Sequence, residues 1–262
     1  MRLGVVSDIH GNLVALRAVV AHLERLGVDR WLSVGDLVGY GPRPNECVEM
    51  VVEMGMLGVA GNHDLIATGE LSGQRSSARA QRSHRWTREA LGADVLDHLR
   101  SLPARLEVDD VLLTHGSLED AEEYVHTADQ AAEQLRQLRV TAPGATTLLL
   151  GNTHQQLLYR EGSARADAVR REPMGVGDGR AVLNPGSVGQ SRQRERRPQA
   201  RALLLDTGAR VAYFRAVDYD VEACLADLRG RGLPADAIHA PPARRIPGRR
   251  RAGRLARRLL RR

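Results

Sequence analysis

Short apolar runs alternate with amphipathic helical stretches along the N-terminal half of the chain. Leu3–Ser7 is a continuous apolar run that predicts a buried strand, and the leucines and valines of residues 13–26 recur at helical spacing. The alternation continues in the strands predicted at Arg30–Val34, Met56–Ala60, Glu107–Thr114 (as two strands) and Thr146–Leu150, and in the helices predicted at Asn45–Glu53, 64–103 and Ala128–Leu138. This spacing indicates a layered α/β domain whose core sheet is largely parallel.

After Gly151 the pattern changes to short strands between turns rich in Gly and Arg. The predicted strands are Leu157–Arg160, Asp167–Arg171, Ala181–Asn184, Ala200–Asp206 and Arg210–Ala216. They suggest a second, mostly antiparallel sheet packed on the first. Tyr219–Arg229 predicts a helix that begins at a cap supplied by Asp218 or Asp220. The expected fold class is therefore α/β, with two packed mixed β-sheets flanked by helices.

The positive charge of the chain is concentrated at its C-terminus. All 38 basic residues are arginine, and ten of them lie in residues 244–262, which contain no acid. Residues 1–243 carry 28 Arg against 32 Asp and Glu, a net charge of −4. The Pro- and Gly-rich residues 241–248 resemble a linker, so we predict one domain, 1–243, followed by a basic tail, 244–262.

Composition narrows the class of protein further. Two cysteines, Cys47 and Cys224, are too few for a disulfide scaffold or a cysteine-ligated zinc site. No apolar run approaches the roughly 18 residues of a membrane span, and the start shows no signal-peptide pattern, so we expect a cytoplasmic protein without membrane association. Aromatic residues make up only 3% of the chain, which disfavours a nucleic-acid module that stacks bases.

Five of the predicted strands end in the same kinds of polar residue. The terminating segments are Asp8-Ile9-His10, Gly35-Asp36, Gly61-Asn62-His63-Asp64, His115-Gly116 and Gly151-Asn152-Thr153-His154. Open α/β sheets bind ligands at the carboxyl ends of their strands, so we expect these side chains to meet there. If the backbone stays extended, the two-residue step from Asp8 to His10 directs both side chains to one side.

Asp, His and Asn ligands without Cys suit divalent Mn, Fe, Zn or similar ions. Two such ions, roughly 3.5–4 Å apart and sharing one carboxylate, would clamp a phosphate and generate hydroxide from water. The strand ends therefore predict a metal site for a phosphoester.

The same motifs, in the same order, resemble those of the calcineurin-like metallophosphoesterases. Asn184-Pro185-Gly186-Ser187-Val188-Gly189 extends the resemblance into the C-terminal half. The segment 39–46, Gly-Tyr-Gly-Pro-Arg-Pro-Asn-Glu, is similar to a bacterial branch related to diadenosine tetraphosphatase and serine/threonine phosphatase.

The resemblance implies a role for each motif residue. It implies that one metal is bound by Asp8, His10 and His154, that a second is bound by Asn62 and His115, and that Asp36 bridges the two. It further implies in-line attack on phosphorus by a metal-bridging hydroxide. His63 would then donate a proton to the leaving oxygen or stabilise charge on the transferring phosphoryl group. Asp64 either orients His63 or caps the following helix.

The sequence departs from the family pattern at two places. The last motif of the family normally has a histidine ligand of the second metal at the position of Asn152, so that site is expected to be weaker, to select Mn or Mg, or to be empty after purification. The Asp and Arg that follow Gly-Asp in protein phosphatases are absent after Gly35-Asp36.

We therefore expect hydrolysis of phosphomonoesters or phosphodiesters, with small or nucleotidic substrates favoured over phosphoproteins. A binding scaffold that has lost catalysis is the alternative that Asn152 favours. A nuclease that uses the basic tail is a further alternative, and a homo-oligomer is also left open.

Overall fold

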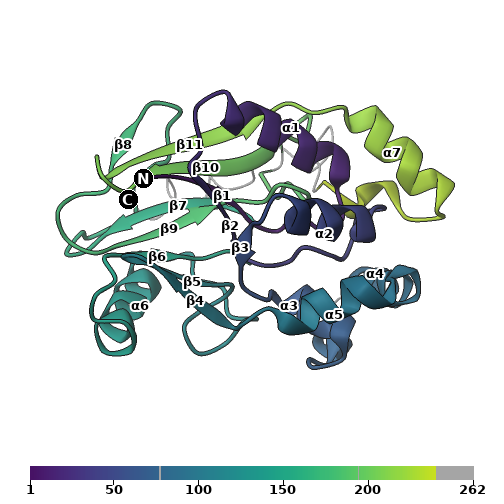
Figure 1. Cartoon of the computed structure of the whole chain (residues 1–262), viewed down its shortest axis with the longest axis horizontal. Coiled ribbons are helices and arrows are strands. Elements are labelled where there is room, and N and C mark those ends of the chain that lie inside the picture. Colours follow the sequence, from purple (N-terminus) through teal and green to yellow (C-terminus); the bar gives the residue numbers. More distant parts are fainter. Residues whose placement is uncertain (77, 194, 240–262) are drawn as a thin grey trace, which may run out of the picture.

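Two mixed sheets pack face to face in the computed structural model, which describes residues 1–76, 78–193 and 195–239 (Figure 1). The first sheet has the strand order β3-β2-β1-β10-β11-β8, and the second has the order β4-β5-β6-β9-β7. The first consists of β1 (Arg2–Val6), β2 (Arg30–Ser33), β3 (Leu57–Gly58), β8 (Met174–Gly175), β10 (Ala200–Asp206) and β11 (Val211–Val217). The second consists of β4 (Arg105–Val108), β5 (Val111–Thr114), β6 (Thr147–Leu149), β7 (Gln156–Arg160) and β9 (Ala181–Pro185).

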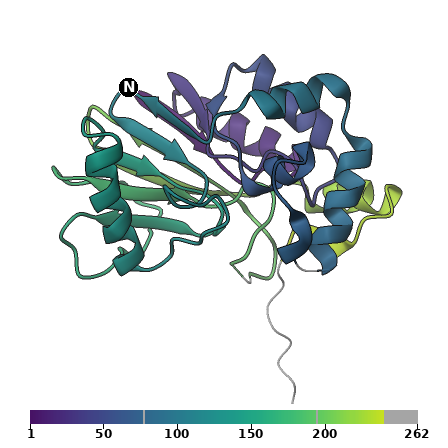
Figure 2. The ribbon, with the colours of Figure 1, turned by 90° about the horizontal axis from the view of Figure 1, so that it is seen from below.

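Helices cover the outer faces of both sheets and pack on one another at one end of the molecule. They are α1 (Leu13–Glu24), α2 (Pro44–Glu53), α3 (Asn62–Thr68), α4 (Ala78–Ala90), α5 (Ala93–Ser101), α6 (Ala128–Thr141) and α7 (Val221–Gly230), with 3₁₀ turns at Gly73–Arg75 and Ala235–Ala237. Helix α6 lies at the opposite end of the molecule from α3, α4 and α5 (Figure 2). No helix in the described part of the chain has both the length and the apolar character that a membrane crossing requires.

The period-two alternation of each strand divides its side chains between two cores. In β1, Leu3 and Val5 face the second sheet and pack between the sheets, whereas Val6 packs with α1 on the other side. In β5, Leu113 faces the inter-sheet core and Leu112 faces α6. Burial on both faces requires helices on the outside, which explains the four-layer arrangement.

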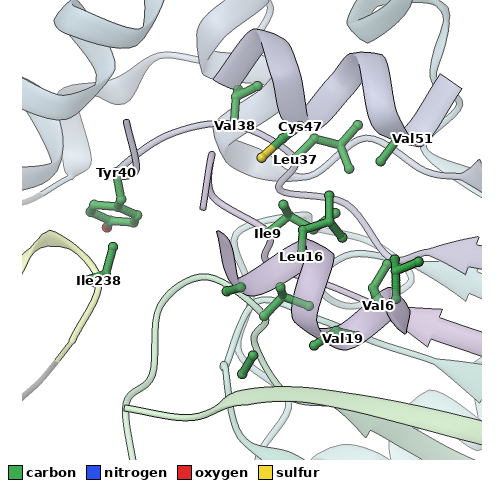
Figure 3. Close-up of a cluster of buried hydrophobic side chains, with 14 of the residues drawn as sticks. Val6, Ile9, Leu16, Val19, Leu37, Val38, Tyr40, Cys47, Val51 and Ile238 are labelled. Atoms are coloured by element: carbon green, nitrogen blue, oxygen red, sulfur yellow. The ribbon is translucent and has the colours of Figure 1, made fainter. Parts of the chain in front are cut away.

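The cluster beneath α1 and α2 continues directly into the loops that follow β1 and β2. Ile9, Leu37 and Val38 lie in these loops and are fully buried or nearly so, packed with Leu16 of α1 and Cys47 of α2 (Figure 3). The apolar residues that alternate with the polar motif residues therefore anchor the loops that carry the predicted ligands.

The expected division of the sheets between the two halves of the chain is wrong. β10 pairs antiparallel with β1, and β9 pairs parallel with β6, so the C-terminal strands contribute to both sheets. A run of strand residues does not reveal its partner, because the pairing is decided by which sheet face the strand can bury.

One predicted strand is also absent from its expected place. Residues 167–171 make only an isolated bridge, Leu158 with Asp167, and β8 forms later, at Met174–Gly175. Pro173, which has no N–H to donate, immediately precedes β8. The other predicted strands and helices are confirmed within a few residues, except that the predicted helical segment 64–103 is divided into α3, α4 and α5, with a 3₁₀ turn between α3 and α4. Asp220 rather than Asp218 caps α7 by accepting from the Ala223 N–H at 3.0 Å. The predicted linker and tail lie outside the described residues, as does the proposed domain boundary at residue 243.

Candidate metal centre

The loops that follow β1 and β2 are tied together by backbone hydrogen bonds. The Asp8 N–H donates to Gly35 O at 3.0 Å, and the His10 N–H donates to Asp36 O at 2.9 Å. Asp8 and His10 do not lie on extended backbone, so the expectation drawn from their two-residue spacing is wrong. Asp8, His10 and Asp36 have φ values of 52°, 49° and 55°, in the left-handed region. Such strain in non-glycine residues is characteristic of functional loops, which the surrounding structure must hold in place.

Four predicted ligands converge in one buried cluster. The ligand atoms of Asp8, His10, Asp36 and His154 all lie within 4.8 Å of one another, and all four residues are buried. Asp8 Oδ1 lies 3.2 Å from His154 Nε2, and Asp36 Oδ2 lies 3.6 Å from His10 Nε2. The topology thus brings together residues from the ends of β1, β2 and β6.

Backbone carbonyls orient the imidazoles of this cluster. His10 Nδ1 lies 3.0 Å from Val38 O, and His154 Nδ1 lies 2.7 Å from Gln190 O. Because a carbonyl only accepts, Nδ1 carries the proton in both rings and Nε2 presents a lone pair. These two Nε2 atoms are 3.2 Å apart, and the buried Asp8 Oδ1 beside them makes no hydrogen bond among the described residues. Three acceptors facing one another are the arrangement that a cation requires, so the residues present fit a divalent metal.

A second group of predicted ligands lies on the other side of Asp36. His115 Nδ1 lies 2.6 Å from Val34 O, which again directs Nε2 inward. That Nε2 lies 3.4 Å from Asp36 Oδ2 and 3.1 Å from Asn62 Oδ1. Asp36 therefore stands between the two groups, at the position that the resemblance assigns to the bridging carboxylate.

The charges of the cluster shift its pKa values strongly. Burial lowers the pKa of His10 to about 4, against the opposing effect of Asp36. Burial would also lower the pKa of His115, but the charge of Asp36 and a hydrogen bond to it outweigh burial and raise that pKa to about 10. For Asp8, burial acts to raise the pKa, yet the neighbouring imidazoles of His154 and His115 lower it to about 2. Without a cation, a proton on His115 neutralises Asp36; metal binding would displace that proton.

His63 projects from the first turn of α3 into the same pocket. Its ring packs against those of His10 and Tyr40, each with a centroid separation of 4.7 Å, and its Nδ1 has no hydrogen-bond partner among the described residues. Burial lowers the pKa of His63 well below its usual value, so the ring is neutral at pH 7. A neutral imidazole donates one N–H, which suits the stabilisation of charge on a phosphoryl group.

The two interpretations of Asp64 are separated by its hydrogen bonds. Its carboxylate accepts from the Gly61 N–H at 2.9 Å and from the Val38 N–H at 3.1 Å. Asp64 therefore caps α3 and ties that helix to the loop that follows β2. These bonds support the capping interpretation and not the orientation of His63.

Asn152 has φ 62°, and its amide points toward a neighbouring loop. Its Nδ2 donates to Ala121 O and to Glu123 O, both at 3.2 Å. The amide thus holds residues 121–123 against the pocket. This contact was not expected from the sequence, which predicted only a metal ligand at this position.

The cavity above the cluster has a volume of about 350 Å³ and includes residues that sequence reasoning missed or left aside. The cavity is lined by predicted site residues, namely Asp36, Asn62, His63, Asn152 and His154. The other residues that line it are Tyr40, Ser76, Ala80, Glu122, Tyr124, Gln190 and Arg192. His84 of α4 is buried, and the centre of its ring lies 4.5 Å from that of His63, with the two rings tilted by 50°. Two signals were available, the Arg-rich helical segment 64–103, which contains His84, and the Arg-rich loop after Gly189. The sequence alone could place neither of them in space.

Comparisons with known proteins agree with this geometry. Residues 1–209 match the calcineurin-like phosphoesterase superfamily domain, so the chain belongs to this superfamily. The structure of a metallophosphoesterase from Sphaerobacter thermophilus is similar, with a TM-score of 0.78, 35% identity, and coverage of 91% of this chain and 96% of that one. A hypothetical protein from Pyrococcus horikoshii shares the fold, with a TM-score of 0.71 at 20% identity, covering 90% of this chain and 96% of that one.

Two further proteins are similar to this chain in sequence. An uncharacterized protein of Methanocaldococcus jannaschii is 32% identical over 197 residues, which cover 72% of this chain and 77% of that protein. A symmetrical bis(5'-nucleosyl)-tetraphosphatase of Vibrio cholerae is 28% identical over 148 residues, 55% of this chain and 54% of that enzyme. The match to the Vibrio enzyme therefore spans about half of its length.

Proposed function

We propose that this chain hydrolyses phosphomonoesters or phosphodiesters with a pair of divalent metal ions, and that its substrates are small or nucleotidic. The observation that carries the proposal is the set of acceptor atoms that face one another without donors: Asp8 Oδ1, His10 Nε2 and His154 Nε2 on one side of Asp36. Asn62 Oδ1 and His115 Nε2, 3.1 Å apart, would form the second set once a cation displaced the proton that His115 shares with Asp36. Two divalent ions held there would supply a Lewis acid for phosphoryl oxygens and a nucleophile derived from water.

The chain's own residues then divide the remaining work. Val34 O, Val38 O and Gln190 O keep the ligating rings in the tautomer with a free Nε2. His63, from the adjacent helix, presents an N–H to the phosphoryl group. The buried apolar loop residues, such as Ile9 and Leu37, hold the ligands in place before substrate arrives.

Two considerations favour nucleotidic substrates over phosphoproteins. The Asp and Arg of the protein-phosphatase motif are missing after Asp36. One curated relative bears the name of a bis(5'-nucleosyl)-tetraphosphatase, although the match spans only part of it.

The test combines metal content with turnover. Elemental analysis of the purified chain is paired with hydrolysis of p-nitrophenyl phosphate and bis(p-nitrophenyl) phosphate. Each assay is run as purified, after removal of metal by a chelator, and after addition of Mn²⁺. We expect close to two metals per chain and turnover that disappears with the chelator and returns with Mn²⁺.

Each departure from this result has a defined meaning. One metal per chain, with activity only on added Mn²⁺, would indicate that Asn152 weakens the second site. No metal and no turnover under any condition would overturn the proposal and favour the binding scaffold. Steep salt dependence of DNA or RNA binding, lost on deletion of residues 244–262, would instead favour the nuclease.

A further inference from the structure

The rim of the metal pocket carries a cation and an exposed aromatic ring from two loops that are distant in sequence. Arg192 follows β9, and Tyr124 lies between β5 and α6. Arg192 Nη1 donates to Tyr124 Oη at 3.0 Å, and the guanidinium carbon lies 5.9 Å from the centre of the ring. Both residues line the cavity that contains Asp36, Asn62 and His63.

Arg192 is held in position by the same residue that orients a metal ligand. The Gln190 side-chain Oε1 accepts from Arg192 Nε at 3.1 Å, while the Gln190 backbone O accepts from His154 Nδ1. Gln190 is itself buried and fixed by its Nε2 donating to Ala237 O at 2.8 Å. The distance between the guanidinium and the metal cluster is therefore set by a short, anchored segment and not by a free surface chain.

Tyr124 is positioned by Asn152. The amide of Asn152 holds the carbonyls of Ala121 and Glu123, and Glu123 is the residue before Tyr124. Tyr124 is 44% exposed, although large hydrophobic side chains in this protein are mostly buried. An exposed ring at the mouth of a polar cavity is available for stacking.

We propose that Arg192 and Tyr124 form a substrate clamp that recognises nucleoside di- and polyphosphates: the guanidinium binds a phosphate adjacent to the scissile one, and the ring stacks on the base. The inference rests on the proposed function, which it deepens by naming the substrate class. A guanidinium matches phosphate oxygens with two parallel N–H donors, and base–aromatic stacking accepts any base.

The charge of the cavity supports a requirement for such a cation. In the proposed enzyme, the metal ions beside Asp36 neutralise that carboxylate and bind the scissile phosphate, which leaves a second phosphate without a cation of its own. A substrate that carries more than one phosphate therefore needs a positive group beside the metals. Among the described residues, Arg192 is the only arginine that lines this cavity.

The test uses three competitive inhibitors of p-nitrophenyl phosphate hydrolysis at constant free Mn²⁺. Inorganic phosphate probes the metal centre alone, pyrophosphate adds a second phosphate, and ADP adds a base. The variants are Arg192→Ala, Tyr124→Phe and Tyr124→Leu. Arg197→Ala is the matched control, because Arg197 is an exposed arginine of the same loop and is not among the residues lining the cavity.

Each variant has a distinct expected signature. Arg192→Ala should weaken pyrophosphate and ADP by about 10- to 100-fold more than it weakens inorganic phosphate, as expected for hydrogen bonds to a charged group. Tyr124→Leu should weaken ADP a further 5- to 50-fold or so relative to pyrophosphate, since the ring is lost. Tyr124→Phe keeps the ring and should leave the ratio of ADP to pyrophosphate affinity unchanged. Arg197→Ala should shift no inhibitor by more than about twofold.

Equal losses for all three inhibitors in Arg192→Ala, or losses no larger than in the Arg197→Ala control, would overturn the clamp. An unchanged ratio of ADP to pyrophosphate affinity in Tyr124→Leu would overturn the stacking role. If the wild-type chain hydrolyses no ester, the proposed function fails independently, and calorimetric titration of the same ligands into the Mn²⁺-loaded variants still decides whether the clamp exists.

Discussion

The pocket floor and the pocket rim are built in different ways. The floor, which we define as Asp8, His10, Asp36, His115 and His154, is buried and is held by backbone carbonyls and by loop backbones that pair with each other. The rim, which we define as Tyr124 and Arg192, is half-buried or exposed and is held by side-chain hydrogen bonds. A backbone carbonyl does not depend on the side chain of its residue, so the floor tolerates changes at the residues that supply the carbonyls, whereas a single substitution removes a contact of the rim. The floor is thus suited to shared chemistry, and the rim to substrate selection.

The largest effect is expected at the centre of the floor. Asp36→Asn should reduce turnover by more than about 100-fold. Loss of a residue that only supports a metal ligand typically lowers metal affinity or activity by about 10- to 100-fold, and Asp36 itself faces both groups of ligands. Metal content should fall with it. Elemental analysis and ester hydrolysis check both, with Asp167→Asn, a half-buried acid paired with Arg160 outside the cavity, as the control. Full activity in Asp36→Asn would refute the metal-pair assignment.

His63→Ala separates catalysis from metal binding within the floor region. We expect turnover to fall by roughly 10²–10⁴-fold, the range typical of groups that handle protons, while metal content stays close to that of the wild type. His98→Ala, in α5, serves as a control for loss of an imidazole outside the pocket. Loss of metal together with activity would make His63 a ligand and would require new roles for the floor residues.

Gly61→Ala tests how tightly the floor is packed. A Cβ at Gly61 would lie 2.1 Å from Asp36 Oδ1 and 2.2 Å from Asp36 N, so the loop would have to move. We expect the free energy of unfolding to fall by about 3 kcal/mol, the upper end of the usual range for overpacking, and metal binding to weaken. Gly230→Ala, where the structure leaves open space, should be neutral or slightly stabilising. Equal stability of the two variants in urea denaturation would show that the floor adapts easily.

The smallest effect is expected at Glu195, in the loop that also carries Arg192. Burial acts to raise the pKa of Glu195, but hydrogen bonds from Arg201 and Ser191 outweigh it and lower that pKa below the usual value of 4.5. A depressed folded pKa means that this carboxylate stabilises the fold above about pH 4.5 and that the stabilisation is lost as the pH falls through the lower folded value.

Glu195→Gln should therefore cost about 1 kcal/mol at pH 7, and less as the pH falls below 4.5. Urea denaturation at several pH values checks this, with the exposed Glu172→Gln as the control. A difference between wild type and Glu195→Gln that is independent of pH would contradict the role given to this carboxylate.

Much of the fold follows from local pattern. The period-two strands and the helical repeats predict most elements, because each face of a strand or helix must be buried or solvated. The pairing of β10 with β1 and of β9 with β6 was not predicted, since strand pairing joins residues far apart in the chain. The short β8 was missed because two residues carry no period.

The site divides in the same way. An acid or an imidazole after an apolar run is visible locally, so the chemical types at the strand ends could be predicted from the sequence, as at Asp8, Asp36 and His154. Four properties become visible in the folded chain: which nitrogen of each imidazole faces the pocket, that Asp64 caps a helix, that Asn152 holds a loop, and that Arg192 contacts Tyr124. These properties depend on contacts between segments that are distant in the chain, 68 residues apart for Arg192 and Tyr124 and 81 for His115 and Val34. Such contacts exist only once the two sheets have packed.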